Sequence, residues 1–183
     1  MVENNWLSAM QAQAQLRQVL ETNQYTGRYG LSLTPRDAQL LAAASAELLR
    51  QERRIEFGGG ILGKIIHEFC DSPYLRQDIY RDSLLRLQEI FYRYKNETED
   101  EISDDELLHF MKEQFDGVCY GDLDYLEETC LDIFAQAIRA GYRGYIETEG
   151  QGEFGQFDPV PRWDRTLYLQ ALRDLCGWGE ADD

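Results

Sequence analysis

The chain has 183 residues, 43 % of them hydrophobic, which is enough for one domain whose core needs no disulfide or metal. Its 18 Lys and Arg against 34 Asp and Glu leave a formal net charge of −16, so a phosphate backbone would be repelled and no nucleic-acid partner is expected. No apolar run approaches the roughly 18 residues of a membrane-spanning helix, and no basic segment followed by an apolar one opens the chain; we therefore expect a cytoplasmic protein with no membrane partner.

The first part of the chain predicts two helices joined by a loop. Residues 3–21 are rich in Ala, Gln and Leu, which favour helix, but their apolar stripe is thin and needs a partner surface. Residues 23–33 contain two Gly and two Tyr and are predicted as a loop. Thr34 can serve as an N-cap and Pro35 suits the first helical position, so a second helix is expected over residues 35–54.

The middle of the chain carries the strongest helical pattern. Residues 55–57 (Ile-Glu-Phe) are a candidate short strand, three glycines follow, and an apolar helix is predicted over residues 61–70. Ser72 and Pro73 repeat the helix-start signal. Beyond them, apolar residues are spaced four, three, four and three apart, at Tyr80, Leu84, Leu87, Phe91 and Tyr94.

Three more helices are predicted in the remainder. Ser103 and Glu106 match a capping box, and their helix is expected to end near Gly117. Asp122 is expected to begin another helix, which ends at Gly141. Residues 142–162 hold four Gly and two Pro and are predicted as an irregular loop; a last helix over 164–176 and a frayed tail at 180–183 follow.

Together these elements predict an all-α fold, with residues 1–183 as a single domain built as a compact array of about seven helices. Residues 145–147 (Tyr-Ile-Glu) can pair with residues 55–57 as a minor two-strand β-ribbon. The thin stripe of the N-terminal helix, residues 1–22, makes it a candidate contact with a partner, and a homodimer is one route.

Acidic residues are concentrated between Glu97 and Glu128. This segment holds thirteen Asp or Glu and one base, Lys112, so its net charge is −12. A run of like charge on helices is usually a solvated face, but it also suits a basic protein partner. Tyr and Arg, which are enriched at interfaces, lie just before it. The residues expected to contact such a partner are Glu97, Glu99, Asp100, Glu101, Asp104, Asp105, Tyr92 and Tyr94.

Two histidines and four cysteines are candidates for metal or nucleophile chemistry. His67 and Cys70 share a helical face at a three-residue spacing, and with Asp71 they form a weak candidate site for zinc or iron. A closed site needs further ligands, from His109, Cys119 or acids elsewhere. The alternative is a partly buried, hydrogen-bonded His67 and a reduced core thiol at Cys70. No catalytic residue, metal or cofactor is therefore assigned.

Two partial motifs are interpreted as structural. Residues 58–64 match part of a phosphate-binding loop, but Ile65 stands where a magnesium-binding Ser or Thr belongs and no parallel sheet is predicted. Residues 116–127 resemble a calcium loop, but Val118 and Tyr120 occupy positions that normally supply oxygen ligands. We interpret the first as a turn where two elements meet closely and the second as an acidic helix–turn–helix capped by Asp122.

Five short stretches are distinctive: RIEFGGGI at 54–61, FCDSPY at 69–74, LQEIFY at 87–92, ISDDEL at 102–107 and FDGVC at 115–119. Together they resemble a family of uncharacterised bacterial proteins of about this size, a domain of unknown function. The resemblance extends from Tyr29 to Ile133. It implies a bacterial, cytoplasmic, helical protein, and it transfers no catalytic or binding residue.

The leading hypothesis is a non-enzymatic protein-interaction or regulatory module with an acidic surface. It rests on the lack of a coherent catalytic set, on the −12 segment and on the thin N-terminal stripe. The alternative is a small metal- or ligand-binding protein, which could be an enzyme, centred on His67 and Cys70. A third hypothesis is a nucleic-acid mimic that occupies a basic site on another protein.

Overall fold

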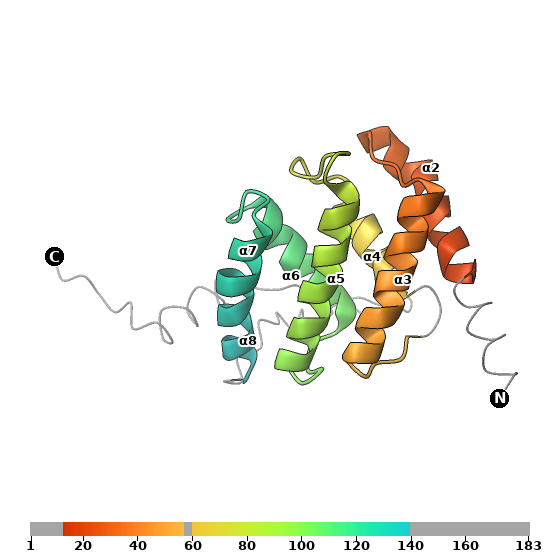
Figure 1. Ribbon diagram of the computed structural model, residues 1–183. Coiled ribbons are helices and arrows are strands. Elements are labelled where there is room, and N and C mark those ends of the chain that lie inside the picture. The colour runs from red at the N-terminus through yellow and green to blue at the C-terminus, as the bar shows by residue number, and fades with distance from the viewer. Residues whose placement is uncertain (1–12, 57–59, 140–183) are drawn as a thin grey trace, which may run out of the picture.

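The computed structural model describes residues 13–56 and 60–139, and most of them are helical (Figure 1). Residues 13–21 are helical and lead into the short α2 (Asn23–Thr26) and the 3-10 turn η1 (Gly27–Tyr29). The longer helices are α3 (Pro35–Gln51), α4 (Gly60–Phe69), α5 (Tyr80–Glu97) and α6 (Asp104–Asp116). The last described helix runs through α7 (Leu123–Tyr125), the π-helical η2 (Leu126–Leu131) and α8 (Asp132–Arg139).

The helices pack in two layers. Helices α3, α5 and α7–α8 lie side by side, with α4 and α6 behind them (Figure 1). Helix α5 is central, because it contacts α3, α4, α6 and α7. Between residues 13 and 139, the missing 57–59 aside, no strand is present, and the predicted all-α fold is confirmed. Nor is any helix in these ranges long and apolar enough to cross a membrane.

The predicted periodicity on α5 explains its central place. The spacing puts five apolar side chains on one face, and each is at most 1 % exposed: Tyr80, Leu84, Leu87, Phe91 and Tyr94. Burying a large apolar side chain contributes about 1.5–3 kcal/mol. These five share one core cluster with Ile65 and Ile66 of α4, Phe110 of α6 and Phe134 of α8.

Three helix starts predicted from capping residues are confirmed. The Thr34 hydroxyl accepts from the Asp37 amide at 3.1 Å, and the Asp37 carboxylate accepts from the Thr34 amide. Ser103 and Glu106 form the same reciprocal pair at the start of α6. The Asp122 carboxylate caps α7 by accepting from two amides, those of Asp124 and Tyr125, each at 3.0 Å.

Two predictions in the first half are corrected. Residues 23–29 are not loop but α2 and η1, because the side chain of Asn23 closes this segment through two hydrogen bonds of 2.8 Å to the amide and carbonyl of Leu33. Helix α3 ends at Gln51 rather than residue 54, since Arg53 adopts a left-handed conformation with φ of 55°. Ile55 and Glu56 form no strand; Phe57 and residues 145–147 lie outside the described residues.

The helix start predicted at Ser72 and Pro73 is wrong. Residues 71–79 are mostly turns, and α5 begins at Tyr80. The Ser72 hydroxyl donates to the Asp116 carboxylate at 2.5 Å and accepts from the Tyr74 amide, so it holds a turn against the end of α6 instead of capping a helix. The predictions for residues 142–162, 164–176 and 180–183 lie outside the described residues.

Candidate functional site

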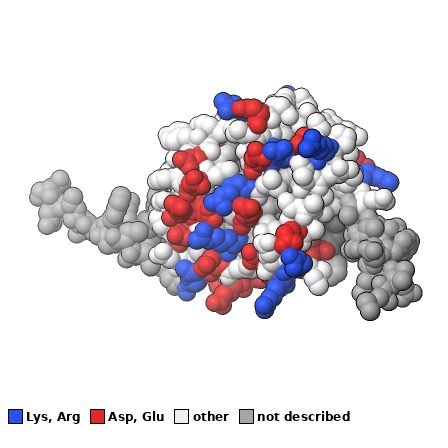
Figure 2. Space-filling model, in the orientation of Figure 1, with Lys and Arg blue, Asp and Glu red and all other residues white. Residues whose placement is uncertain are grey.

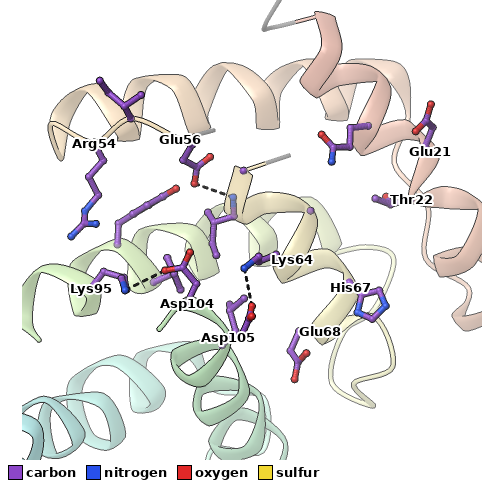
Figure 3. A pocket seen from close by; sticks show the side chains of 18 of the residues that line it. Glu21, Thr22, Arg54, Glu56, Lys64, His67, Glu68, Lys95, Asp104 and Asp105 are labelled. Atoms are coloured by element: carbon purple, nitrogen blue, oxygen red, sulfur yellow. Dashed lines mark hydrogen bonds and ion pairs between the residues drawn. The ribbon is translucent and has the colours of Figure 1, made fainter. Parts of the chain in front are cut away.

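A cleft of about 970 Å³ lies between helical residues 13–21, the segment before α4, α4 itself, α5 and α6. Figure 3 shows charged side chains from the segment before α4, from α4, α5 and α6 around the first turns of α4, with Glu21 farther away at the other end of the cleft. This volume is at the upper end of the range for small-molecule sites, about 300–1,000 Å³.

Glu56 lies where α4 begins. Gly60 has a φ of +64°, and a Cβ at this position would overlap the Glu56 carboxylate, so glycine is what allows the two to approach. The Oε1 atom of Glu56 accepts from the amide of Ile61 at 2.9 Å (Figure 3). Burial raises the pKa of Glu56, and Asp104 nearby adds to that effect, while the Ile61 amide opposes it.

The three cations of the cleft already have acidic partners. Lys64 pairs with Asp105 at 2.8 Å, and the pKa of Lys64 is raised by this bond. Lys95, whose side chain is 8 % exposed, pairs with Asp104 at 3.2 Å and donates to the carbonyl of Ile102 (Figure 3). Opposite charges in contact cancel most of each other's field, so these cations add little positive potential to the cleft.

The remaining cation, Arg54, pairs with Asp100 at 2.9 Å and donates to Asn96. Two acids that line the cleft, Glu21 and Glu56, form no ion pair with any described residue. The cleft therefore keeps a negative surplus next to a half-buried carboxylate.

The cleft wall also includes an exposed isoleucine and a buried tyrosine. Ile55 is 81 % exposed, the most exposed large apolar side chain among the described residues. Tyr92 is 4 % exposed, and its buried hydroxyl has no hydrogen-bond partner in the described part of the chain. A buried hydroxyl without a partner costs free energy.

The partner surface predicted from tyrosines is corrected by burial. Tyr94 is fully buried, and its hydroxyl lies 2.5 Å from both the Glu127 carbonyl and the Asp132 carboxylate, so it links α5 to η2 and α8. Tyr92 is also buried, and it lies at the wall of the cleft rather than on an open surface.

The acidic segment does not form a surface of one sign. Among the described residues, seven of its thirteen acids pair with bases, and six of the seven bases come from outside the segment: Glu97 with Arg139, Asp100 with Arg54, Asp104 with Lys95, Asp105 with Lys64, Asp116 with Lys112, Asp124 with Arg86, and Glu127 with Arg86 and Arg93. Figure 2 shows acidic and basic side chains interleaved on the face of α3, α5 and α8. Of the other predicted contacts, Glu99 and Glu101 are exposed.

The candidate metal residues do not converge. His67 is exposed, and its ring lies 5.7 Å from that of Tyr25. Cys70 is 5 % exposed, and its thiol donates to the His67 carbonyl at 3.3 Å. Asp71 pairs with Lys112 at 3.0 Å. In the described ranges, no group of three or more His, Cys, Asp or Glu is placed to hold a metal. The expected burial of His67 is thus wrong, and that of Cys70 is confirmed.

The other partial motifs have structural roles. Gly63 and Lys64 lie inside α4, where helical amides are not free to cradle a phosphate. Asp116 bonds Ser72 and Lys112, and Asp122 is a helix cap. His109, named as a possible metal ligand, lies 3.5 Å from the Glu68 carboxylate.

Sequence reasoning missed the residues that make the cleft distinctive, namely Arg54, Ile55, Glu56 and Lys95. The available indication was the glycine run after Glu56, because repeated glycines often mark a close approach of backbone and another group. Only the packing of α4 against α5 and α6 brings these residues together.

A family model described as a family of unknown function matches residues 18–144, a range that includes all the residues lining the cleft. Neither the curated proteins nor the solved structures include one that matches this chain. The match extends over more than half of the sequence, and the chain therefore belongs to this family of unknown function, DUF6323.

Proposed function

We propose that this protein is a non-enzymatic interaction module whose cleft binds a basic segment of a partner protein. The observation that carries the proposal is Glu56, a half-buried carboxylate at the cleft wall that has no ion-pair partner among the described residues. Such a carboxylate gains more from a cation than an exposed one does, because the surrounding dielectric screens the interaction less.

The charge around Glu56 favours a cation over an anion. Arg54, Lys64 and Lys95 are held by Asp100, Asp105 and Asp104. An incoming anion would have to compete with these carboxylates for each base, whereas an ammonium or guanidinium group meets Glu56 without such competition. Electrostatic complementarity of this kind sets specificity and the rate of association.

The apolar residues favour a protein segment as the source of that cation. Ile55 directly precedes Glu56 and is 81 % exposed, so an apolar side chain of a partner can cover it while a neighbouring Lys or Arg reaches the carboxylate. Arg is enriched at protein interfaces, and the buried centre of an interface is more apolar than its rim. The alternative centred on His67 and Cys70 lacks such support, since those side chains diverge.

The test is an array of short synthetic peptides in which one Arg or Lys is flanked by apolar residues, beside charge-reversed Glu peptides of the same length. We expect saturable binding of the basic peptides only. Glu56→Gln keeps the shape and the acceptor for the Ile61 amide but removes the charge, and it should weaken binding about tenfold, as for hydrogen bonds to charged groups. Glu128→Gln, the same change at an exposed position away from the cleft, should leave the affinity within about twofold.

Two results would contradict the proposal. One is equal binding of basic and acidic peptides, and the other is equal weakening by Glu56→Gln and Glu128→Gln. Arginine amide and spermidine, titrated by calorimetry, form the small-molecule arm of the test. If either binds tighter than every basic peptide, the cleft is a small-amine site and the protein-segment proposal fails.

A further inference from the structure

Cys119 and Cys130 bring two thiols together on one side of the molecule. Their sulfur atoms are 3.6 Å apart, and each residue is 5 % exposed. Cys119 lies in the turn between α6 and α7, and Cys130 lies in the π-helical segment η2. Two thiols in contact need only about 1.6 Å of further approach to reach the 2.05 Å of a disulfide bond.

The turn that carries Cys119 lies at the surface. Val118 and Tyr120, the neighbours of Cys119, are 49 % and 73 % exposed, and the ring of Tyr120 meets that of Tyr74 edge-on, with the centroids 6.4 Å apart. Tyr120 and Gly121 both have positive φ, at 50° and 85°, so the turn is not a continuation of α6, although hydrogen bonds of 2.9 Å from the amides of Cys119 and Gly121 tie it to that helix. The thiol pair therefore lies directly beneath surface residues, close to where a small oxidant in solvent would arrive.

The opposite wall is also an irregular element. π-Helical turns inside α-helices, with i→i+5 hydrogen bonds, are rare and are frequent at functional sites. Leu126–Leu131 is such a turn, and Cys130 occupies its fifth position.

We propose that Cys119 and Cys130 are a thiol pair that hydroperoxides convert reversibly to an intrachain disulfide. The sulfur of Cys130 attacks a peroxide oxygen, the O–O bond breaks, and a sulfenic acid and one water result. The sulfur of Cys119 then attacks the sulfenic sulfur, the S–O bond breaks, and the second water leaves. In balance, two thiols and one hydrogen peroxide give one disulfide and two waters.

Polarity within the pair assigns these roles. Either sulfur can donate the hydrogen bond that joins the pair. When Cys119 donates, the pKa of Cys130 is lowered and that of Cys119 is raised, and in that arrangement Cys130 is the attacking sulfur. Burial raises the pKa of Cys70 instead, which makes Cys70 an internal comparison within the same chain.

The experiment is a titration of the full chain with hydrogen peroxide, followed by alkylation and non-reducing peptide mapping. No Lys or Arg lies between the two cysteines, so trypsin leaves both on one peptide, which on oxidation loses two hydrogens, about 2 Da, and no longer takes up the two alkyl groups. Cleavage after Glu127 and Glu128 separates the two cysteines unless a disulfide joins them. We expect the 119–130 cross-link to form while Cys70 is still a thiol, and dithiothreitol to reverse it.

Two single variants give readouts other than the cross-link itself. Cys119→Ala should leave Cys130 without a resolving thiol, so peroxide should drive it to sulfinic acid, which dithiothreitol does not reverse. Cys130→Ala should slow the peroxide oxidation of Cys119 by about tenfold or more, because its attacking partner is gone. The proposal is overturned if Cys119 and Cys130 form disulfides with Cys70 or Cys176 in comparable yield, or if either stays reduced when Cys70 is oxidised.

Discussion

At the scale of single residues, Glu56 shows how a local backbone feature creates a functional group. Gly60 allows the carboxylate to approach the first turn of α4, and the amide of Ile61 binds it there. Helix amides stabilise an anion, but burial and Asp104 disfavour it, and the net effect raises the pKa of Glu56. The carboxyl group thus changes charge closer to neutral pH than an exposed glutamate does.

Glu56 should give both stability and binding a dependence on pH. Because its folded pKa is raised, its contribution to stability is complete below the unfolded value of 4.5 and is lost as pH rises through the folded pKa. Glu56→Gln has no such loss. In urea denaturation, the free energy of unfolding of the variant should therefore increase relative to that of wild type as pH rises from 4 to 7. The affinity for a basic peptide should rise over the same interval by more in wild type than in Glu56→Gln. A stability difference that does not change with pH would show that Glu56 ionises as freely as an exposed carboxyl.

Glu127 is the most buried acid among the described residues that pairs with a base. Its side chain is 6 % exposed, and it binds Arg86 and also Arg93, the latter at 2.8 Å. Removing either arginine leaves a carboxylate in the interior with less compensation, which is costly. The arginines themselves can turn towards solvent, since they are 37 % and 51 % exposed.

A double-mutant cycle tests this pair. Arg86→Ala should lower the free energy of unfolding by about 1–3 kcal/mol in wild type and by at least about 1 kcal/mol less in the Glu127→Gln background. The control is Arg50→Ala, because Arg50 and Glu47 form an exposed pair and the loss there should stay within about 0.5 kcal/mol. Equal losses in the two backgrounds would mean that the buried pair contributes nothing.

At the scale of elements, capping residues determine where α3, α6 and α7 begin. Ser103 and Glu106 satisfy each other's amides, and Asp122 alone binds two. These contacts are local in sequence, so capping residues predict them well. Ser72 is also a capping residue type and is followed by Pro73, as at a helix start. Its hydroxyl nevertheless donates to Asp116, 44 residues away, and no pattern near Ser72 predicts that partner.

Ser103→Ala should therefore destabilise the protein by about 1 kcal/mol, the usual value for a lost N-cap. Ser32→Ala is the matched control, because Ser32 is exposed and lies outside any helix, and its effect should stay within about 0.5 kcal/mol. Chemical denaturation measures both. Hydrogen exchange should in addition show faster exchange in the first turn of α6 only for the Ser103 variant, and equal exchange in both variants would argue against the cap.

At the scale of the whole molecule, one core joins all the long helices. Helix α5 contacts α3, α4, α6 and α7, and its buried face belongs to the same cluster as side chains of α4, α6 and α8. A shared core predicts that these helices unfold together, as expected of one domain.

Leu87→Ala tests this cooperativity at the centre of α5. Leu87 is fully buried, so we expect a loss of about 2–5 kcal/mol from the lost contacts and the resulting cavity. Leu40→Ala, at a side chain that is 46 % exposed, should cost much less. Far-ultraviolet circular dichroism and hydrogen exchange in α3, α6 and α8 should report the same midpoint. Separate midpoints for α3 and α8 would show two cooperative units instead of one.

The same scale explains why charge along the sequence misrepresents charge in space. The run from Glu97 to Glu128 has a net charge of −12, yet bases from α4, α5 and α8 reach into it. Ion pairs join residues about 40 positions apart, such as Arg54 with Asp100 and Lys64 with Asp105. A linear count of charge cannot include partners of this kind.

The sequence by itself determined the helical class, the buried stripe of α5 and the starts of α3, α6 and α7, because periodicity and capping act over at most a few residues. The tertiary structure alone decided what lies around Glu56, which sulfur meets Cys119 and which bases meet the acidic segment. Those features join residues from different helices. Their distances follow from how α4, α5, α6 and η2 pack, and packing depends on the shape of the whole core.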